Sequence, residues 1–253
     1  AEDPYLAKNG VAHDGEIASR LGLKGIPAAA ESIALQTMLR VAQATGARLH
    51  VARISSAESV ELIRQAKQNG MAVTADVSLQ HLHLTEMDIG FFDSMAHLKP
   101  PVRTQRDRDA LRAGLLDGTL DAICSDHTPV DDDAKALPFA ESHAGASALE
   151  LLLPLTLKWA AQAKCAPLQA LAQVTLHPAR ILGIEAGHLQ VGAPADVVIY
   201  DPEKEWRIEG RALISQGKNT PFVHHAVTGK VTGTLTQGQL VFQQESLQVN
   251  QAA

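Results

Sequence analysis

The segment Leu120-Asp121-Ala122-Ile123-Cys124-Ser125 is an apolar run with the composition of a buried strand, and Asp126-His127-Thr128-Pro129 follows it directly. Two earlier segments, 49–54 and 72–77, have a similar composition. Helical patterns separate the three, and repeated strand–helix units predict a parallel sheet. The sequence therefore indicates an α/β fold with Asp126 at the end of one of its strands.

Helix boundaries follow from start and stop signals. Residues 28–44 carry apolar side chains at roughly helical spacing, and Gly46 follows as a typical helix end. Ser55-Ser56-Ala57-Glu58 has the pattern of a capping box and predicts a helix to about residue 69. Further helices are predicted at 106–117, at 147–163 with a kink or break at Pro154, and at 167–174 with Pro167 in the first turn.

The character of the sequence changes after Gly187. Residues 192–202 and 229–242 contain strand-forming residues between glycine turns, which predicts short strands in a small β appendage. We therefore expect three parts. They are an α/β domain over residues 1–186, a β-sandwich-type appendage over 187–245 and a polar tail over 246–253.

The composition is that of an ordinary globular chain. Its 253 residues are 45% hydrophobic and carry a net charge of −6, with Lys and Arg scattered along the sequence. This argues against a nucleic-acid-binding surface, and no apolar run approaches the ~20 residues of a membrane span. Cys124 and Cys165 suit neither a disulfide framework nor a zinc knuckle, so we expect a cytoplasmic protein.

Five short motifs follow one another along the α/β part. They are Leu21-Gly22-Leu23-Lys24-Gly25-Ile26-Pro27, His50-Val51-Ala52-Arg53-Ile54-Ser55, Val73-Thr74-Ala75-Asp76-Val77 with Gln80-His81-Leu82, Lys99-Pro100-Pro101-Val102-Arg103, and Ser125-Asp126-His127-Thr128-Pro129. Together they resemble the dihydroorotase branch of the amidohydrolase superfamily, as does the segment after Gly187. The resemblance implies a zinc-dependent (β/α)8 TIM barrel that cyclises carbamoyl aspartate reversibly. A complete barrel needs about 250 residues, so we expect only its C-terminal part here, about strands 6–8 with flanking helices.

The resemblance also implies roles for two strand ends. A zinc-ligating histidine after the sixth barrel strand falls on Arg53, and the aspartate after the eighth strand, which binds metal and moves a proton, falls on Asp126. Another ligand histidine, after the fifth strand, would directly precede Ala1. The His-x-His pair that opens the metal site would lie in a missing N-terminal half. Asp126 is then the only ligand position retained in this chain.

Three positions linked to the substrate are changed or weak. By the same resemblance, an asparagine that contacts substrate falls on Lys99, and a histidine that helps to hold the substrate carboxylate falls on Val130. Valine offers no hydrogen-bond donor, and a lysine ammonium cannot reproduce the paired donor and acceptor of an amide. Gly145 is a further, weak candidate for substrate binding.

Arg53 bears most directly on the metal. A guanidinium has only donors and never loses its charge, so it cannot ligate a cation. At an effective dielectric of ~20, two unit charges ~4 Å apart repel each other by roughly 4 kcal/mol. We therefore hypothesise that a salt bridge between Arg53 and Asp126 replaces the metal, that Asp126 is a vestigial general acid and base, and that no cofactor is bound.

Other polar residues receive structural interpretations. His81 and His83 could bind a metal, but with no third ligand nearby a structural role is favoured. The acidic run Asp131-Asp132-Asp133 is expected to form a flexible, solvated loop. The remaining histidines that stand out are expected to cap, pack or lie in a solvated loop: His13, His127 and the pair His224-His225.

Three functions remain open. The first is a catalytically inactive dihydroorotase-like protein that acts as a structural partner of aspartate carbamoyltransferase, because the family implied by the resemblance includes such members. The second is an active zinc-dependent dihydroorotase or other cyclic-amide hydrolase, completed by the missing N-terminal half. The third is a noncatalytic barrel that holds an anionic metabolite with Lys99, Arg53 and Arg103. We expect an oligomer, with open sheet edges covered by the missing half or a partner.

Overall fold

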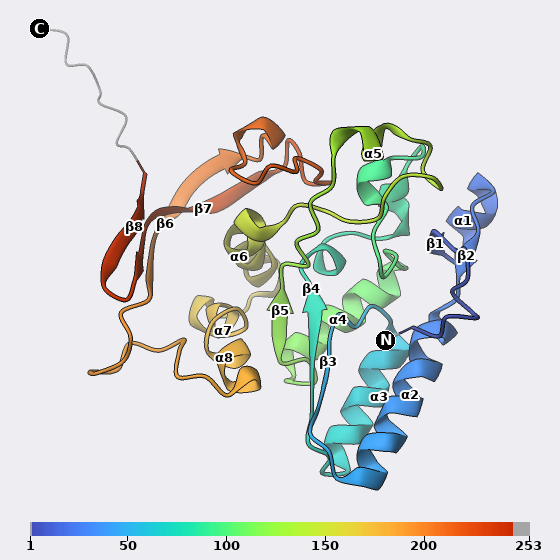
Figure 1. Ribbon diagram of the computed structural model, residues 1–253, viewed down its shortest axis with the longest axis horizontal. Coiled ribbons are helices and arrows are strands. Elements are labelled where there is room, and N and C mark those ends of the chain that lie inside the picture. The colour runs from blue at the N-terminus through green and yellow to red at the C-terminus, as the bar shows by residue number, and fades with distance from the viewer. Residues whose placement is uncertain (1, 245–253) are drawn as a thin grey trace, which may run out of the picture.

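The computed structural model describes residues 2–244, in which an α/β part is followed by an antiparallel sheet (Figure 1). The polar tail expected over residues 246–253 lies outside the described residues. Among the helices between residues 2 and 244, none combines the length and the apolar character needed to cross a membrane.

A three-stranded parallel sheet forms the centre of the α/β part (Figure 1). It consists of β3 (Leu49–Val51), β4 (Val73–Ser78) and β5 (Ala122–Cys124), with β4 in the middle. Both pairings are parallel, and helices connect the strands, as parallel neighbours require. The α/β fold predicted from the sequence is therefore confirmed. All three carboxyl ends lie at the same edge of the sheet.

Two helices contact this sheet, α2 (Ala28–Thr45) at β3 and α3 (Ala57–Gln68) at β4, and α4 (Gln105–Leu116) packs against α3. α2 ends at Gly46, whose φ of 68° suits glycine. The N-cap of α3 is Ser56, whose hydroxyl accepts the Ser59 N–H at 3.2 Å. The capping box predicted from Ser55 to Glu58 is therefore wrong, because the N-cap is Ser56 and the Ser55 N–H donates to Glu31.

The later helices correct one further prediction. α6 (Leu152–Ala163) begins after the 3-10 turn η4 (Leu149–Leu151), so Pro154 lies in its first turn. Proline is tolerated there because the first N–H groups of a helix have no partner within it. The kink or break predicted at Pro154 is wrong. α7 (Pro167–Ala172) starts at Pro167 as predicted, and α8 (Leu176–Leu182) follows.

The C-terminal antiparallel sheet contains β6 (Val197–Arg207), β7 (Ala226–Thr236) and β8 (Gln239–Gln243), with β7 in the middle. β6 and β7 have 11 residues each and exceed the short strands predicted. The segment between them returns to the α/β part, where Ile208 and Phe222 are fully buried in the same cluster as Trp159 of α6. The two sheets are thus joined by one hydrophobic core.

The acidic run at 131–133 forms part of a short helix rather than the flexible loop expected. Asp131 is the N-cap of α5, and Asp132 and Asp133 occupy its first turn. Carboxylates at a helix N-terminus interact favourably with the unpaired N–H groups there, which explains the correction. The other short elements are β1 (Ala12–His13), α1 (Glu16–Leu21), β2 (Gly25–Ile26), η1 (Gln80–Leu82), η2 (Glu86–Ile89), η3 (Ser94–Ala96) and η5 (Gly210–Ala212).

Candidate functional site

Arg53 and Asp126 lie just beyond the carboxyl ends of β3 and β5, and their side chains meet. Arg53 Nη1 donates to Asp126 Oδ1 at 2.9 Å. The arginine side chain is 47% exposed and the aspartate side chain 15% exposed. An ion pair with this exposure contributes at most about 1 kcal/mol to stability. The structure thus brings together the two residues that sequence analysis paired, across 73 positions of chain.

Both residues have a left-handed backbone conformation. The φ angle is 59° at Arg53 and 44° at Asp126. This region costs a residue with a Cβ roughly 1–2 kcal/mol, and such strain collects at functional sites. The conformation at Arg53 is fixed by its N–H group, which donates to Asp76 Oδ1 at 2.7 Å. The two strand ends are therefore held in a shape that a free chain would avoid.

Asp76 of β4 connects the strand ends from the middle of the sheet. Besides the Arg53 N–H, its carboxylate accepts the Cys124 thiol at 3.3 Å and lies 3.0 Å from His50 Nε2. Burial, followed by the Asp76 charge, raises the pKa of Cys124 far above its ordinary value, so this thiol stays protonated. No role was predicted for Asp76 from the sequence. Alternation along β4 could have placed it on the face opposite Val73, Ala75 and Val77.

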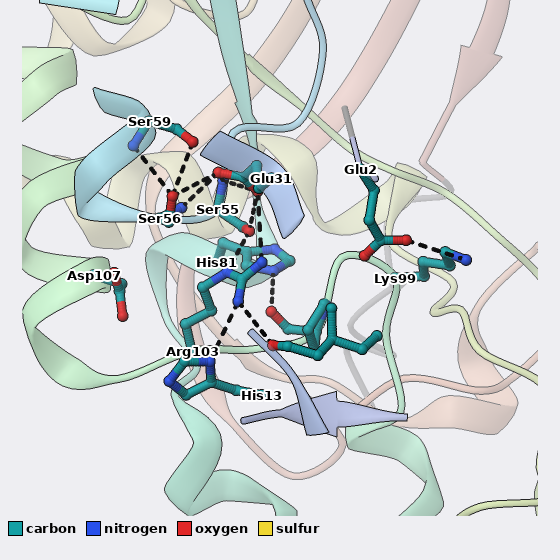
Figure 2. A network of polar contacts seen from close by, with 12 residues as sticks. Glu2, His13, Glu31, Ser55, Ser56, Ser59, His81, Lys99, Arg103 and Asp107 are labelled. Carbon is teal, nitrogen blue, oxygen red and sulfur yellow. Dashed lines mark hydrogen bonds and ion pairs between the residues drawn. The ribbon is translucent and has the colours of Figure 1, made fainter. Parts of the chain in front are cut away.

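A small cleft opens beside Arg53. It is lined by Glu2, Ala52, Arg53, Lys99 and Pro100. Lys99 Nζ lies 3.3 Å from Glu2 Oε2, and Figure 2 shows the two side chains facing each other. Lys99, the residue that the resemblance links to substrate, therefore lines this cleft, and its charge is met by a carboxylate of the same chain.

A buried ion pair fixes the loop that carries Arg53 (Figure 2). Glu31 of α2 accepts the backbone N–H groups of Ser55 at 3.1 Å and Ser56 at 3.0 Å, and both serine hydroxyls. Arg103 Nη2 lies 3.8 Å from Glu31 Oε2, and its Nε donates to Ser55 Oγ at 2.7 Å. Both charged side chains are 1% exposed. The loop after β3 is thereby fastened to α2 and to the segment before α4.

Arg103 therefore does not belong to the anion-binding mouth in which the sequence analysis placed it. Its guanidinium is buried against Glu31, and its Nη1 also contacts His13 Nδ1 at 3.2 Å. Burial alone would raise the pKa of Glu31, but the Arg103 charge and the serine hydroxyls outweigh it and hold that pKa below its ordinary value. Glu31 and Arg103 are a charged structural pair.

Val130 and Gly145 are fastened to one another through a buried amide. The Asn219 side chain accepts the Val130 N–H at 3.0 Å and donates to Gly145 O at 3.0 Å and Thr128 O at 3.1 Å. Asn219 is 1% exposed and comes from the segment between β6 and β7. The part that Val130 and Gly145 play toward a substrate stays a prediction.

Gly145→Ala is expected to lower the free energy of unfolding by about 1–3 kcal/mol. The φ angle at Gly145 is 142°, and an added Cβ would lie 2.6 Å from Thr128 Cγ2 and 2.9 Å from Thr128 O. Urea unfolding of the variant would measure the loss. Gly22→Ala is the matched control, because its φ is 66° but nothing lies within 4 Å of its Cβ position. Equal losses in the two variants would contradict the steric explanation.

The histidines considered in the sequence analysis have protein partners. His81 bonds to Ser78 Oγ at 2.6 Å and to Pro101 O at 3.1 Å, and His83 Nε2 bonds to Leu155 O at 3.0 Å. Burial lowers the pKa of His81, and that of His83 to about 3, so both rings are neutral. His127 Nδ1 accepts the Ala148 N–H at 3.1 Å. His13 is buried and packs as expected, whereas His224 is exposed.

The described residues do not by themselves fit a zinc ion. Zinc sites use at least three N, O or S ligands, and residues 2–244 contain no group of three His, Cys, Asp or Glu side chains placed to hold a metal. Asp126 Oδ1 also accepts a hydrogen bond from Arg53. A zinc ion at Asp126 would need ligands from outside these residues and a displaced Arg53 side chain.

Comparison of the sequence with known proteins gives consistent results. A protein-family model described as "Amidohydrolase family" matches residues 10–241. The chain is 41% identical over 240 residues to a dihydroorotase-like protein of Pseudomonas putida, covering 95% of this chain and 56% of the relative. It is 39% identical over 243 residues to a dihydroorotase of Geobacter sp. strain M21, covering 96% and 57%. The chain thus spans about half the length of these relatives.

Solved structures agree on the fold. An L-hydantoinase (dihydropyrimidinase) from Arthrobacter aurescens superposes with a TM-score of 0.84 and 27% identity, over 92% of this chain and 53% of that chain. A dihydropyrimidinase from Brevibacillus agri gives a TM-score of 0.83 at 23% identity, over 95% and 54%. The α/β part therefore has the fold of a partial barrel-type domain, as predicted.

Proposed function

The chain belongs to the amidohydrolase family, and from that membership we propose that it is the C-terminal part of a dihydroorotase-like protein without catalytic activity. In this proposal β3, β4 and β5 are strands six to eight of the barrel. The whole protein acts as a structural partner of aspartate carbamoyltransferase. Relatives at 39–41% identity with dihydroorotase-related names support the branch of the family.

One observation supports the proposed lack of catalytic activity. Arg53 Nη1 lies 2.9 Å from Asp126 Oδ1, so the guanidinium charge occupies the neighbourhood of the carboxylate that a zinc ion would need. A cation brought to Asp126 meets this positive charge, and repulsion on the order of 1 kcal/mol from a guanidinium that is 47% exposed corresponds to about a fivefold loss of affinity. The Arg53 guanidinium also occupies one acceptor site of Asp126 Oδ1.

The direct experiment is metal analysis of the purified full-length protein, together with a dihydroorotase assay in the presence of added zinc. The proposal expects no stoichiometric zinc and no turnover. Mixing the protein with aspartate carbamoyltransferase should raise the thermal stability of the transferase and yield a stable complex. Stoichiometric zinc with turnover would overturn the inactivity, and failure to form a complex would overturn the partnership.

Arg53→His in the full-length protein is expected to tighten zinc binding by about 100-fold or more, because it removes a positive charge and supplies a ligand nitrogen. Zinc affinity would be measured by competition with a chromophoric chelator. Arg53→Met is the matched control, since it removes the charge without adding a ligand, and it should give a smaller gain. No change in either variant would show that Arg53 does not govern the metal site.

An active zinc-dependent dihydroorotase or other cyclic-amide hydrolase is the second candidate, favoured by relatives named dihydroorotase at about 40% identity. Its remaining ligands would have to come from outside residues 2–244. The zinc content and turnover of the unmodified protein separate the two candidates, because only the active enzyme requires both.

A further inference from the structure

We propose that a cavity at the amino ends of the parallel strands binds a phosphate group, either as free phosphate or as a small phosphate monoester. The cavity has a volume of about 330 Å³, near the lower end of the roughly 300–1,000 Å³ range of small-molecule sites. Its lining is polar and contains two arginines. The lining residues are Arg48, Thr74, Asp121, His177, Arg180 and Ile181.

The cavity lies at the opposite edge of the sheet from Arg53 and Asp126. Arg48 directly precedes β3, Thr74 is the second residue of β4, and Asp121 directly precedes β5. The other lining residues belong to α8, which lies near the amino end of β5 in Figure 1. The inference therefore goes beyond the proposed function and does not depend on a metal or a reaction at Asp126.

The two arginines supply positive charge that the described chain does not neutralise. Both residues are exposed, and neither Arg48 nor Arg180 forms an ion pair within residues 2–244. Arg48 Nη2 donates to the backbone oxygen of Ile181, which fixes one side of its guanidinium on α8. A guanidinium has five N–H donors, so further donors remain for a ligand.

The one carboxylate that lines the cavity, that of Asp121, is already paired. Lys67 Nζ lies 2.8 Å from both of its oxygens, and the Ala75 N–H donates to Oδ2 at 2.8 Å. Lys67 offsets the charge of Asp121, so the two arginine charges stay uncompensated. At neutral pH a phosphate monoester carries about −1.5 to −2 charges, which matches two arginines better than a single carboxylate group would.

Two neutral polar side chains complete the lining. His177 Nδ1 lies 3.0 Å from Asp121 O, which can only accept, so Nδ1 carries the proton and Nε2 of the neutral ring is an acceptor. The Thr74 hydroxyl lies 2.9 Å from His50 Nδ1 and, having one proton and two lone pairs, can form a further bond. Phosphate offers both kinds of partner, because its oxygens accept from guanidinium groups and a monoprotonated phosphate donates from its P–O–H group.

The test uses the full-length protein, with inorganic phosphate and glycerol 3-phosphate as probes, titrated calorimetrically at neutral pH and constant ionic strength. Both probes should bind, because both present a phosphate group. Tighter binding of glycerol 3-phosphate would identify a monoester as the ligand, and equal binding would identify free phosphate. Arg180→Gln is expected to raise both Kd values by about tenfold, the effect of losing one hydrogen bond to a charged group. Arg48→Gln should do the same.

The matched control is Arg40→Gln, which removes the same charge from an exposed arginine of α2 that does not line the cavity and should leave both Kd values unchanged. Unchanged Kd values in both Arg180→Gln and Arg48→Gln would overturn the proposal, because the phosphate would then be bound elsewhere. The absence of binding up to about 10 mM of either probe would overturn it as well, since the cavity would then be closed in the whole protein.

Discussion

Glu31→Ala is expected to lower the free energy of unfolding by about 3–5 kcal/mol, the usual cost of breaking a buried ion pair by removing one partner. The substitution leaves Arg103 charged and 1% exposed beside no carboxylate. It also removes the acceptor of four hydrogen bonds from Ser55 and Ser56. Chemical denaturation monitored by circular dichroism would measure the loss.

Two comparisons make this result specific. Glu203→Ala removes an exposed carboxylate from β6 and should cost less than about 0.5 kcal/mol. Adding Arg103→Met to Glu31→Ala should recover part of the loss, because the unpaired buried charge is then gone. A loss below about 1 kcal/mol for Glu31→Ala alone would contradict the proposed role of the pair.

Acidification is expected to destabilise the protein strongly below pH 6.5. Burial lowers the pKa of His83 to about 3 and that of His97 to about 4 in the folded chain, whereas an unfolded histidine titrates near 6.5. As the pH falls below 6.5, these histidines therefore bind protons in the unfolded chain but stay neutral in the folded chain. This contribution to stability is fully present above pH 6.5 and is lost as the pH falls toward 4.

Between pH 6.5 and 5.5 the two histidines together should remove about 2 kcal/mol, because each unit of pH costs up to about 1.4 kcal/mol per group. Unfolding curves at pH 7.5, 6.5 and 5.5 would measure how steeply the free energy of unfolding depends on pH. His83→Gln and His97→Gln should each reduce this pH dependence, whereas the exposed His224→Gln should leave it unchanged. A pH dependence that is unchanged in both buried variants would contradict its assignment to His83 and His97.

The sequence predicts the framework well because its signals are local. Gly46 and Pro167 mark the end of α2 and the start of α7 where expected, and the alternation of strands and helices gives the parallel sheet. The proximity of Arg53 and Asp126 could be anticipated because the ends of parallel strands gather at one edge, even though the chain between them is long.

The remaining features depend on contacts between distant segments. Nothing near Arg103 in the sequence indicates that Glu31 will bury its charge, so its exclusion from the cleft could not be predicted. A role for Asp76 could be predicted only with knowledge of which residues on β3 and β5 lie beside it. The pairing of Lys99 with Glu2 joins residues almost a hundred positions apart, and neither residue has a neighbour that suggests the other.

The left-handed backbone at residues 53 and 126 has a consequence for how this scaffold can change. Because Asp76 and the neighbouring loop impose the turn at residue 53, the direction in which this position projects its side chain is set by the surroundings and not by arginine itself. The side chain at this strand end can therefore change while the backbone conformation stays the same. Single substitutions at such a position can exchange ligand, charge or ion pair while the supporting architecture stays in place.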